Sequence, residues 1–590
     1  MKIRQLEILP VILFSALLMG KSNSVALNVV KNAFSSEPET GIEHLTPYLL
    51  EIAKNGHTYS QTDKEQLKVL GFNFQGRLVN RSLFTRPESI GLNEFHDRGL
   101  FRIHFATQGT HAVNTLDNDA NGIPDYVDNV AAVLDTVANV ILSQMGYTAP
   151  PGDSWYATGS DNGGSSHYDV YLNKISSNYY GYVQSEDDAQ GTGDNENSSL
   201  VREENSFTSY LIMRNNYSGF KGKEIDNIRV TIAHEFFHAV QFGFDGWQKF
   251  WLLEATATWM EEALYDDIND CYQYMPRWFA SPQTALDAAG PKQLHWYGSY
   301  IFFEYINAHL GGSNVIKDIF DFSLEKNSQN INSSIWSINQ ALVKNNSNFS
   351  EALNNMVIAN QIMSSFPLDG NYTYEEALFY NVSPAILDTV NFQTGFQQSL
   401  NSSELEQFAS QYIKLVSATP VQVNLSNLSG GMDELQMHSI IKLNDDSYKI
   451  YSTPTVNIDP VFTKSVTLAV VSQDSIREKW SYALSFEDGI PGTNPLGPDE
   501  FVLDNPYPNP FNNRLNFSVY MLADNNLTVN VVDLNGRQAA LIFKGKLPAG
   551  NHVFGWSGKL DNGSAAASGV YFLVFKGSTT QSWKPITLVK

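Results

Sequence analysis

The residues best placed for chemistry lie in one stretch of the sequence, TIAHEFFHAV, from Thr231 to Val240. In a helix, side chains four residues apart lie one above the other, so His234 and His238 would present two imidazoles to one point. Glu235 would stand beside them, toward the opening of the site. Two imidazoles at this spacing suit a zinc ion, whereas the plainer alternative is a pair of histidines hydrogen-bonded in a core.

A catalytic zinc needs a third protein ligand and one open position. The stretch WLLEATATWMEE, from Trp251 to Glu262, has the apolar spacing of a helix. Glu254 lies near its start, and the alanines that follow are small enough to let two helices approach closely. We therefore expect Glu254 to be the third ligand. Glu261 and Glu262 compete for this role, but they lie at the far end of the helix, where carboxylates are usually solvated.

These motifs resemble those of known enzymes. HEFFH followed by WLLEATATW is similar to the gluzincin group of zinc metallopeptidases, in which HExxH and a later helical Glu bind zinc. More narrowly, RIHFATQGTHAV, DNDANGIPDYVD, YDVYL and YGSYIFFEYI, in this order around the zinc motif, resemble a family of secreted bacterial metalloproteases over about Gly99 to Ile362. The resemblance implies zinc on His234, His238 and Glu254, with Glu235 as the catalytic carboxylate.

The sequence departs from thermolysin, a gluzincin, at two points. The gap between His238 and Glu254 is shorter, and Thr258 stands where thermolysin-like enzymes place an Asp that supports the zinc site. The residue that orients the zinc-binding histidines is therefore open, and Asp245 is one candidate.

The expected reaction is hydrolysis of a peptide bond in a protein or peptide substrate. Glu235 would take the proton of a water molecule activated by zinc as that water attacks the peptide carbonyl, and would return the proton to the departing amine. The developing oxyanion needs a second donor besides the metal. Near the start of a predicted helix at 294–306 we favour Tyr297 over His295 and Tyr300, although aromatic residues at helical spacing are equally typical of a core.

A second stretch, DNDANGIPDYVD from Asp117 to Asp128, matches the pattern of a calcium-binding loop. Gly122 occupies the sixth position, where such loops turn sharply. Calcium prefers six to eight oxygen ligands. The oxygen ligands expected here are the side chains of Asp117, Asp119, Asn121, Asp125 and Asp128 and the main-chain carbonyl of Ile123. The alternative is an Asp- and Asn-rich turn that caps the following helix.

The N-terminus has the pattern of an export signal, because two basic residues precede a short apolar run and small residues follow. We expect a signal peptide over residues 1–26 that is cleaved near Ala26, and an uncleaved anchor is the alternative. The next segment, 27–98, has helical patterns at 45–53 and 63–70. This segment is either a propeptide or an N-terminal subdomain.

Residues 99–400 are expected to form the metallopeptidase domain, in which strands feed helices. The elements expected here are strands at 99–107, 169–172 and 209–213, a helix at 126–145, and mostly helices over 227–362. The predicted fold is a multidomain chain with an α/β gluzincin-like metallopeptidase body, whose HExxH motif lies in a helical subdomain. An all-β module and an immunoglobulin-like β-sandwich are expected to follow.

The remainder of the chain has short alternating β patterns. Residues 404–487 predict an accessory β-sandwich, and the proline- and glycine-rich stretch 488–498 predicts a linker. The last unit, 499–590, opens with DNPYPNPFN and has a hairpin turn signal at Asn535-Gly536. It resembles the C-terminal sorting domain of type IX secretion cargo. The resemblance implies the type IX secretion machinery as a partner and passage through the outer membrane, with release or surface attachment. A permanent β domain that binds carbohydrate or a partner is the alternative.

Composition narrows the remaining classes. Acidic residues outnumber basic ones by 62 to 38, a net charge of -24, which disfavours nucleic acid as a partner. The single cysteine, Cys271, allows no internal disulfide. Beyond the signal, no stretch approaches about 18 uninterrupted apolar residues, so we expect no membrane span in the mature chain. The leading hypothesis is a secreted zinc endopeptidase, and the rival is a surface adhesion or scaffold protein that keeps the fold without catalysis.

Overall fold

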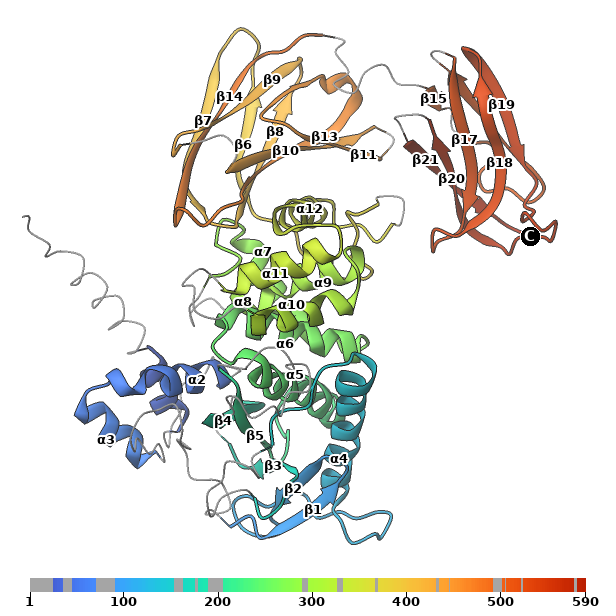
Figure 1. The fold of residues 1–590 in the computed structure, drawn as a ribbon. Helices are drawn as coiled ribbons and strands as arrows, with labels where there is room; N and C mark the ends of the chain where they lie inside the picture. Colours follow the sequence, from blue (N-terminus) through green and yellow to red (C-terminus); the bar gives the residue numbers. More distant parts are fainter. Residues whose placement is uncertain are drawn as a thin grey trace, which may run out of the picture. The chain divides into compact units, whose positions relative to one another are not determined.

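The computed structural model describes most of the chain, and Figure 1 shows it as a ribbon. The described residues are 25–34, 45–70, 91–152, 163–175, 179–188, 205–288, 295–325, 333–366, 370–430, 434–444, 446–491, 501–503, 506–521, 524–577 and 581–590. The predicted signal peptide lies outside them up to Ser24, and the predicted linker lies outside them from residue 492 onward. The chain divides into two compact units, Met1–Arg277 with Asp287–Phe349, and Trp278–Leu286 with Ser350–Lys590.

Two helices of the first unit confirm the helical patterns in the segment ahead of residue 99. α2 (Thr46–Asn55) has most of its apolar side chains buried, and a 3₁₀ turn (Gly56–Thr58) leads to α3 (Gln61–Val69), which is mostly exposed. Ser60 caps α3, because its side chain accepts a hydrogen bond from the Asp63 amide at 3.2 Å.

A five-stranded sheet in the order β1-β2-β3-β5-β4 supports the helices of the first unit. Its strands are β1 (Glu94–Arg98), β2 (Phe101–Phe105), β3 (Tyr168–Asn173), β4 (Gly181–Asp188) and β5 (Phe207–Arg214). β2, β3 and β5 run parallel and confirm the three predicted strands, while β1 and β4 pair antiparallel at the two edges. The edge strands escaped prediction because β1 is polar and almost wholly exposed, and β4 runs into an acidic tract.

Long helices pack against this sheet. α4 (Asp125–Ala138), continued by a π-helical turn (Asn139–Gln144), contacts β2 and α5, and α5 (Glu224–Asp245) contacts β4 and β5. Asp125–Gln144 is long and apolar enough to span a membrane by composition alone, but half of that stretch is buried, as in the core helix of a globular unit. The helices that follow α5 are α6 (Phe250–Tyr265), a 3₁₀ turn (Asp270–Gln273), α7 (Met275–Ala280), α8 (His295–Gly298), α9 (Tyr300–His309), α10 (Ser313–Glu325) and α11 (Ser333–Lys344).

α5 and α6 pack along each other and are buried over most of their length. Every residue of α5 from Val230 to Phe244 is buried, and so is every residue of α6 from Trp251 to Glu262. Buried polar side chains are stable only when they find partners within the protein. The histidines and glutamates on these two helices therefore depend on one another.

The second unit contains α12 (Phe349–Ile362) and a sandwich of two sheets, with strand orders β11-β10-β13-β8-β6 and β12-β9-β14-β7. The strands are β6 (Ile386–Phe392), β7 (Gln398–Glu406), β8 (Ser410–Ser417), β9 (Val421–Asn427), β10 (Leu435–Leu443), β11 (Tyr448–Ser452), β12 (Thr455–Ile458), β13 (Thr463–Ser472) and β14 (Lys479–Asp488). Alternate residues of β14 are buried, as in a strand with one face on a core.

This sandwich begins earlier than predicted. The sequence places its start at residue 404 and extends the metallopeptidase domain to residue 400. In the structure β6 pairs with β8 and β7 pairs with β14, so the residues from Ile386 onward belong to the sandwich. β6 escaped prediction because nearly all its residues are exposed, which removes the alternation that marks a strand.

A second sandwich ends the chain, with strand orders β15-β16-β19 and β18-β17-β20-β21. Its strands are β15 (Phe501–Leu503), β16 (Leu515–Met521), β17 (Asn525–Val532), β18 (Gln538–Leu547), β19 (Gly550–Trp556), β20 (Gly569–Lys576) and β21 (Gln581–Leu588). β17 and β18 form a hairpin at the predicted turn, where Gly536 has a φ of 71°, a conformation that glycine adopts without strain.

A buried histidine makes the stability of the first sandwich depend on pH. His438 on β10 is 1% exposed, and burial lowers its pKa to about 4. Its Nε2 lies 2.6 Å from Asn354 Oδ1 and its Nδ1 lies 2.8 Å from Ser452 Oγ. The neutral ring donates to the amide oxygen and accepts from the hydroxyl, so both nitrogens are satisfied without a charge.

We expect the free energy of unfolding of this sandwich to fall as the pH falls from about 6.5 to 4, because the unfolded chain binds a proton that folded His438 excludes. The loss is roughly 3 kcal/mol across this window, and above it the group has no effect because the ring is neutral in both states. Urea unfolding of the wild type and of His438→Gln at pH 7 and pH 4.5 measures it. Equal pH dependence in the two proteins would contradict the assignment.

Candidate metal centre

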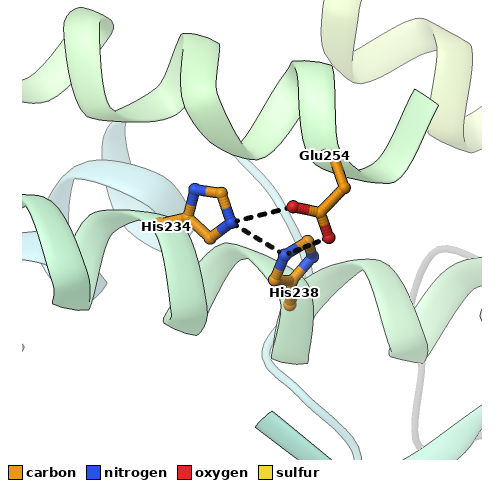
Figure 2. A group of neighbouring side chains, drawn as sticks. All are labelled: His234, His238 and Glu254. Carbon is orange, nitrogen blue, oxygen red and sulfur yellow. Dashed lines mark hydrogen bonds and ion pairs between the residues drawn. The ribbon is translucent and has the colours of Figure 1, made fainter. Parts of the chain in front are cut away.

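α5 and α6 bring three metal-ligating side chains to one point (Figure 2). His234 and His238 come from α5, one turn apart, and Glu254 comes from α6. The two Nε2 atoms lie 3.0 Å apart. Glu254 faces both rings, with Oε2 at 3.4 Å from His234 Nε2 and Oε1 at 3.2 Å from His238 Nε2. The three residues that the sequence selects as ligands thus lie together.

The spacing of these atoms fits a single metal ion. Zinc–ligand bonds of about 2.0–2.1 Å at tetrahedral angles place the ligand atoms roughly 3.3 Å from one another, close to the distances found here. Each of the three residues is at most 1% exposed. Within the described part of the chain Glu254 Oε2 makes no hydrogen bond, which is costly for a buried carboxylate oxygen unless a cation binds there.

The outer nitrogen of His234 faces a carboxylate, which fixes the position of the ring proton. His234 Nδ1 lies 2.6 Å from Glu261 Oε1. An ionised carboxylate only accepts hydrogen bonds, so Nδ1 carries the proton and donates it. The Nε2 atom of His234 is then left with a lone pair directed at the site, which is the form of histidine that binds a metal.

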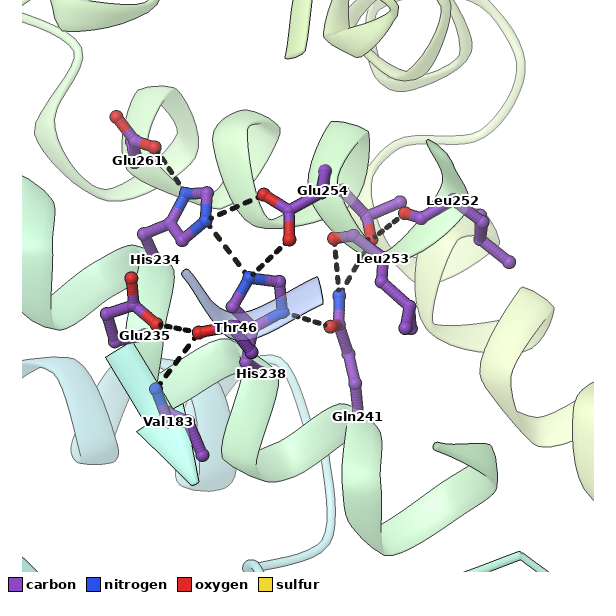
Figure 3. A network of polar contacts seen from close by, with 11 residues as sticks. Thr46, Val183, His234, Glu235, His238, Gln241, Leu252, Leu253, Glu254 and Glu261 are labelled. Atoms are coloured by element: carbon purple, nitrogen blue, oxygen red, sulfur yellow. Dashed lines mark hydrogen bonds and ion pairs between the residues drawn. The ribbon is translucent and has the colours of Figure 1, made fainter. Parts of the chain in front are cut away.

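His238 is held in the same way by Gln241 (Figure 3). The Gln241 Nε2 group donates to the Leu253 carbonyl at 3.0 Å and to Thr256 Oγ1 at 2.9 Å, and Thr256 Oγ1 itself donates to the Leu252 carbonyl. The amide oxygen of Gln241 therefore faces His238 Nδ1, at 2.7 Å. His238 Nδ1 donates to it, and Nε2 again presents a lone pair.

Two imidazole lone pairs and a carboxylate therefore meet at one buried point. Groups that only accept hydrogen bonds repel one another at such distances unless a cation lies between them. Burial raises the pKa of the Glu254 carboxyl, but the imidazoles of His238 and His234 lower it by more, so the net shift is downward. A cation between the three groups would remove this repulsion and keep Glu254 ionised.

The candidate for orienting the histidines, Asp245, is wrong. Asp245 lies at the end of α5, where its carboxylate accepts hydrogen bonds from the Trp247 amide at 3.0 Å and from the Gln248 side chain at 2.7 Å. The orienting groups are Glu261 and Gln241. Asp245 accepts hydrogen bonds from the turn that follows α5 because the Trp247 amide and the Gln248 side chain lie just beyond it in the chain.

The helical spacing of the sequence could have indicated both orienting residues. Glu261 follows Glu254 by two helical turns, so both carboxylates point from α6 toward α5. Gln241 follows His238 by one turn and lies on the same face of α5. From the sequence, Glu261 is a candidate only for the third ligand, although its place two turns beyond Glu254 puts it beside His234.

Glu262, the remaining candidate ligand, is engaged elsewhere. Its carboxylate accepts a hydrogen bond from the Cys271 thiol at 2.9 Å, and both residues are buried. Burial and the neighbouring carboxylate raise the pKa of the Cys271 thiol well above its ordinary value. The thiol is thus neutral and enclosed, without the properties of a nucleophile.

Tyr297, the predicted oxyanion donor, lies on α8 beside the metal centre. Its ring centroid is 6.4 Å from that of His234, and the ring stacks on Tyr274 at 4.9 Å. The neighbouring candidates His295 and Tyr300 are also buried. The position of Tyr297 fits both roles weighed from the sequence, a donor at the site and an aromatic residue of the core.

Glu235 is completely buried on α5, next to the predicted ligand His234 in the chain. Its Oε2 accepts a hydrogen bond from Thr46 Oγ1 at 2.9 Å, and Thr46 Oγ1 in turn accepts one from the Val183 amide at 3.0 Å (Figure 3). Thr46 is the first residue of α2. A residue of the N-terminal segment therefore contacts the predicted catalytic carboxylate, and no motif in the sequence indicates this contact.

The Asp-rich loop ahead of α4 gathers carboxylates. Asp117, Asp119 and Asp125 bring oxygen atoms within 4.8 Å of one another, and Gly122 has a φ of 88°, as the sixth position requires. Asp117 also accepts a hydrogen bond from the Gly122 amide at 3.0 Å, as in a self-capped turn. The other expected ligands bond to one another within the loop, because the Asn121 side chain donates to Asp128 Oδ2 at 2.9 Å and accepts from the Ile123 amide at 2.7 Å. Calcium binding stays a prediction that calorimetric titration with Ca²⁺ would test.

Replacing the carboxylate that orients His234 should weaken zinc binding. In Glu261→Gln the ring nitrogen loses its charged acceptor, and loss of such a partner typically costs about 10- to 100-fold in metal affinity. We expect a fall of this size when the protein competes with a chromophoric chelator for zinc. Glu224→Gln, on the exposed first turn of α5, is the matched control and should bind as the wild type does. Equal affinity in the two variants would show that Glu261 does not support the ligand.

Comparison with known families identifies the C-terminal part of the chain. Residues 505–588 match the family described as the secretion system C-terminal sorting domain. The chain ends in a type IX secretion sorting domain. The sorting domain spans strands β16 to β21, and it marks the chain for export by the type IX secretion machinery to the cell surface or the medium, as predicted.

Three solved structures resemble parts of this chain. PorZ, a surface component of the type IX secretion system of Porphyromonas gingivalis, is 19% identical over 18% of this chain and 14% of its own, with a TM-score of 0.12. Latent dimeric PorU of the same organism is 14% identical over 29% and 18%, with a TM-score of 0.14. A β-1,2-glucanase from Parabacteroides distasonis is 9% identical over 29% and 28%, with a TM-score of 0.12.

The chain spans less than a third of the length of each of these proteins. No curated protein matches it. The activity of the body ahead of the sorting domain therefore stays a prediction.

Proposed function

We propose that the exported protein is a zinc-dependent endopeptidase with a gluzincin-like body. The observation that carries the proposal is the meeting of two imidazole lone pairs and one carboxylate between α5 and α6, with both Nδ1 protons directed outward. Three protein donors of this kind suit a catalytic zinc, which keeps a fourth position open. Export by type IX secretion supports a role on substrates outside the cell.

The donor set assigns a role to each side chain. His234, His238 and Glu254 would hold zinc, which supplies Lewis-acid polarisation and lowers the pKa of a water molecule. Glu235 would take a proton from the attacking water and return it to the departing amine. Its Oε2 already accepts an O–H hydrogen bond in this structure, from Thr46, which supports its capacity to receive a proton from oxygen.

Tyr297 is proposed as the donor to the oxyanion that develops on the scissile carbonyl. Its ring lies beside His234, on the short helix α8 that borders the centre. A donor that acts only in the transition state affects kcat more than KM. Tyr297→Phe should therefore lower kcat selectively, and a variant with unchanged kcat would assign the ring to the core.

A rival proposal is a surface adhesion or scaffold protein that keeps this fold without catalysis. Glu235 favours the enzyme, because a scaffold has no chemical need for a buried carboxylate next to the metal ligands. The test uses the exported protein recovered from the medium. About one zinc per chain by atomic absorption, together with hydrolysis of casein or gelatin, is the expected result. Zinc without hydrolysis, in protein from which the N-terminal segment has been removed, would support the scaffold, and a protein that binds no zinc would contradict the endopeptidase.

A further inference from the structure

The first residue of α2 joins two groups at the proposed active site. Thr46 is 2% exposed, and its hydroxyl donates to Glu235 Oε2 while it accepts from the Val183 amide (Figure 3). Val183 lies on β4, the edge strand of the sheet, which pairs with β5 on its other side. The Thr46 hydroxyl thus bonds to two groups at once. It accepts a hydrogen bond from an amide on the side of β4 that faces away from β5, and it donates one to the carboxylate assigned to proton transfer.

A second residue of α2 reaches the same region. Tyr48 is 4% exposed, and its ring lies 6.1 Å from that of Trp296 on α8. Burial raises the pKa of the Tyr48 hydroxyl, and the negative charge of Glu254 raises it further. This buried hydroxyl has no hydrogen-bond partner among the residues that the structure describes. A buried hydroxyl of this kind is costly unless a ligand or a water molecule binds it.

The docked helix covers Glu235. This carboxylate is fully buried and the Thr46 hydroxyl of α2 lies 2.9 Å from its Oε2, so a substrate cannot reach it while α2 is in place. The helix is held by apolar side chains that are themselves almost fully buried, namely Leu49, Leu50 and Ile52. None of the described residues of α2 belongs to the metal-ligating group. The proposed ligand set is therefore complete without α2.

We propose that α2 is an intramolecular inhibitor that keeps the chain latent, with Thr46 as a latch on Glu235, until the segment carrying α2 is displaced or removed. This inference rests on the proposed peptidase function. It differs from inhibition by a metal-binding side chain, because a neutral hydroxyl binds the proton-transfer residue and leaves the ligands untouched. A substrate reaching Glu235 must first displace Thr46.

The test uses the full chain, purified with its N-terminal segment and loaded with zinc. Thr46→Val keeps the shape of the side chain but removes both hydrogen bonds of the latch. Ile52→Asp places a charge in the buried contact of α2 and should undock the helix. The matched controls make the same chemical changes at exposed positions of α3, Thr62→Val and Val69→Asp.

Two measurements follow the state of the site, the rate of casein hydrolysis and the affinity for a small hydroxamate by calorimetry. We expect Ile52→Asp to raise both by about tenfold or more and Thr46→Val to raise both by a smaller factor, because each enlarges the open population. The controls should behave as the wild type does.

The two measurements test the inhibitory role of α2 and the peptidase function separately. Equal hydroxamate affinity in the wild type and Ile52→Asp would overturn the inhibitor. Hydrolysis by the wild type as fast as by the variants would also overturn it, while the peptidase function would stand. A gain in hydroxamate affinity without any hydrolysis would support the inhibitor and overturn the peptidase function.

Discussion

Glu235→Gln should keep the zinc of the exported protein but lower its rate of casein hydrolysis by about 10²- to 10⁴-fold, the range that a positioned acid–base residue contributes. The amide matches the carboxylate in size and still accepts hydrogen bonds. It cannot take up a proton from water near neutral pH. The loss should therefore fall on kcat, with KM close to that of the wild type.

The matched control for this variant is Glu224→Gln, which makes the same chemical change at the exposed start of α5. It should hydrolyse casein at the wild-type rate. Zinc content and circular dichroism of both variants exclude loss of metal or of fold as the cause of a difference. Full activity in Glu235→Gln, at the same rate as in Glu224→Gln, would refute the role given to this carboxylate.

The second large effect is expected at Glu254, the anionic member of the ligand set. In Glu254→Gln the amide is a poor zinc ligand, and two neutral imidazoles alone bind the ion weakly. We expect the zinc content to fall from about one per chain to near zero after dialysis, and hydrolysis to disappear with it. Atomic absorption on the dialysed protein measures the first effect.

Loss of zinc should also lower thermal stability, because an ion that binds only the folded state stabilises it. Zinc at a hundredfold excess over its Kd contributes about 2.7 kcal/mol. Removing it from the wild type with a chelator should thus lower the Tm of the first unit by roughly 4 °C, at about 2 cal/mol/K of unfolding entropy per residue. The chelator should change Glu254→Gln little. A variant that keeps stoichiometric zinc would remove Glu254 from the ligand set.

The sequence predicts the metal ligands because their spacing repeats the helical turn. His234 and His238 must share a face of any helix that contains them, and Glu254 follows on the next amphipathic stretch. The central strands β2, β3 and β5 were predictable for a similar reason, since their apolar residues form short runs between turn signals. The last sandwich was predictable from its turn signals and from its resemblance to secretion cargo.

The other features of the fold and the site depend on contacts between distant segments, which the periodicity of the sequence does not reveal. Glu261 orients His234 only because α5 and α6 lie side by side in a particular register. Thr46 reaches Glu235 across 189 positions of sequence, and nothing in its neighbourhood distinguishes it from any threonine at the start of a helix. β6 was missed because its exposed residues carry no pattern of burial. These features follow from packing, and packing is settled by the whole chain.

The enclosure of Cys271 has a practical outcome for an exported protein. Outside the cell, free thiols are oxidised and pair between chains. The Cys271 thiol is buried beside Glu262 and protonated, so copies of the protein should not become cross-linked through it. A cysteine introduced at Val69, which is 87% exposed on α3, would then be the one group that reacts readily with a maleimide dye. A fluorophore at that position could report the departure of the N-terminal segment in real time.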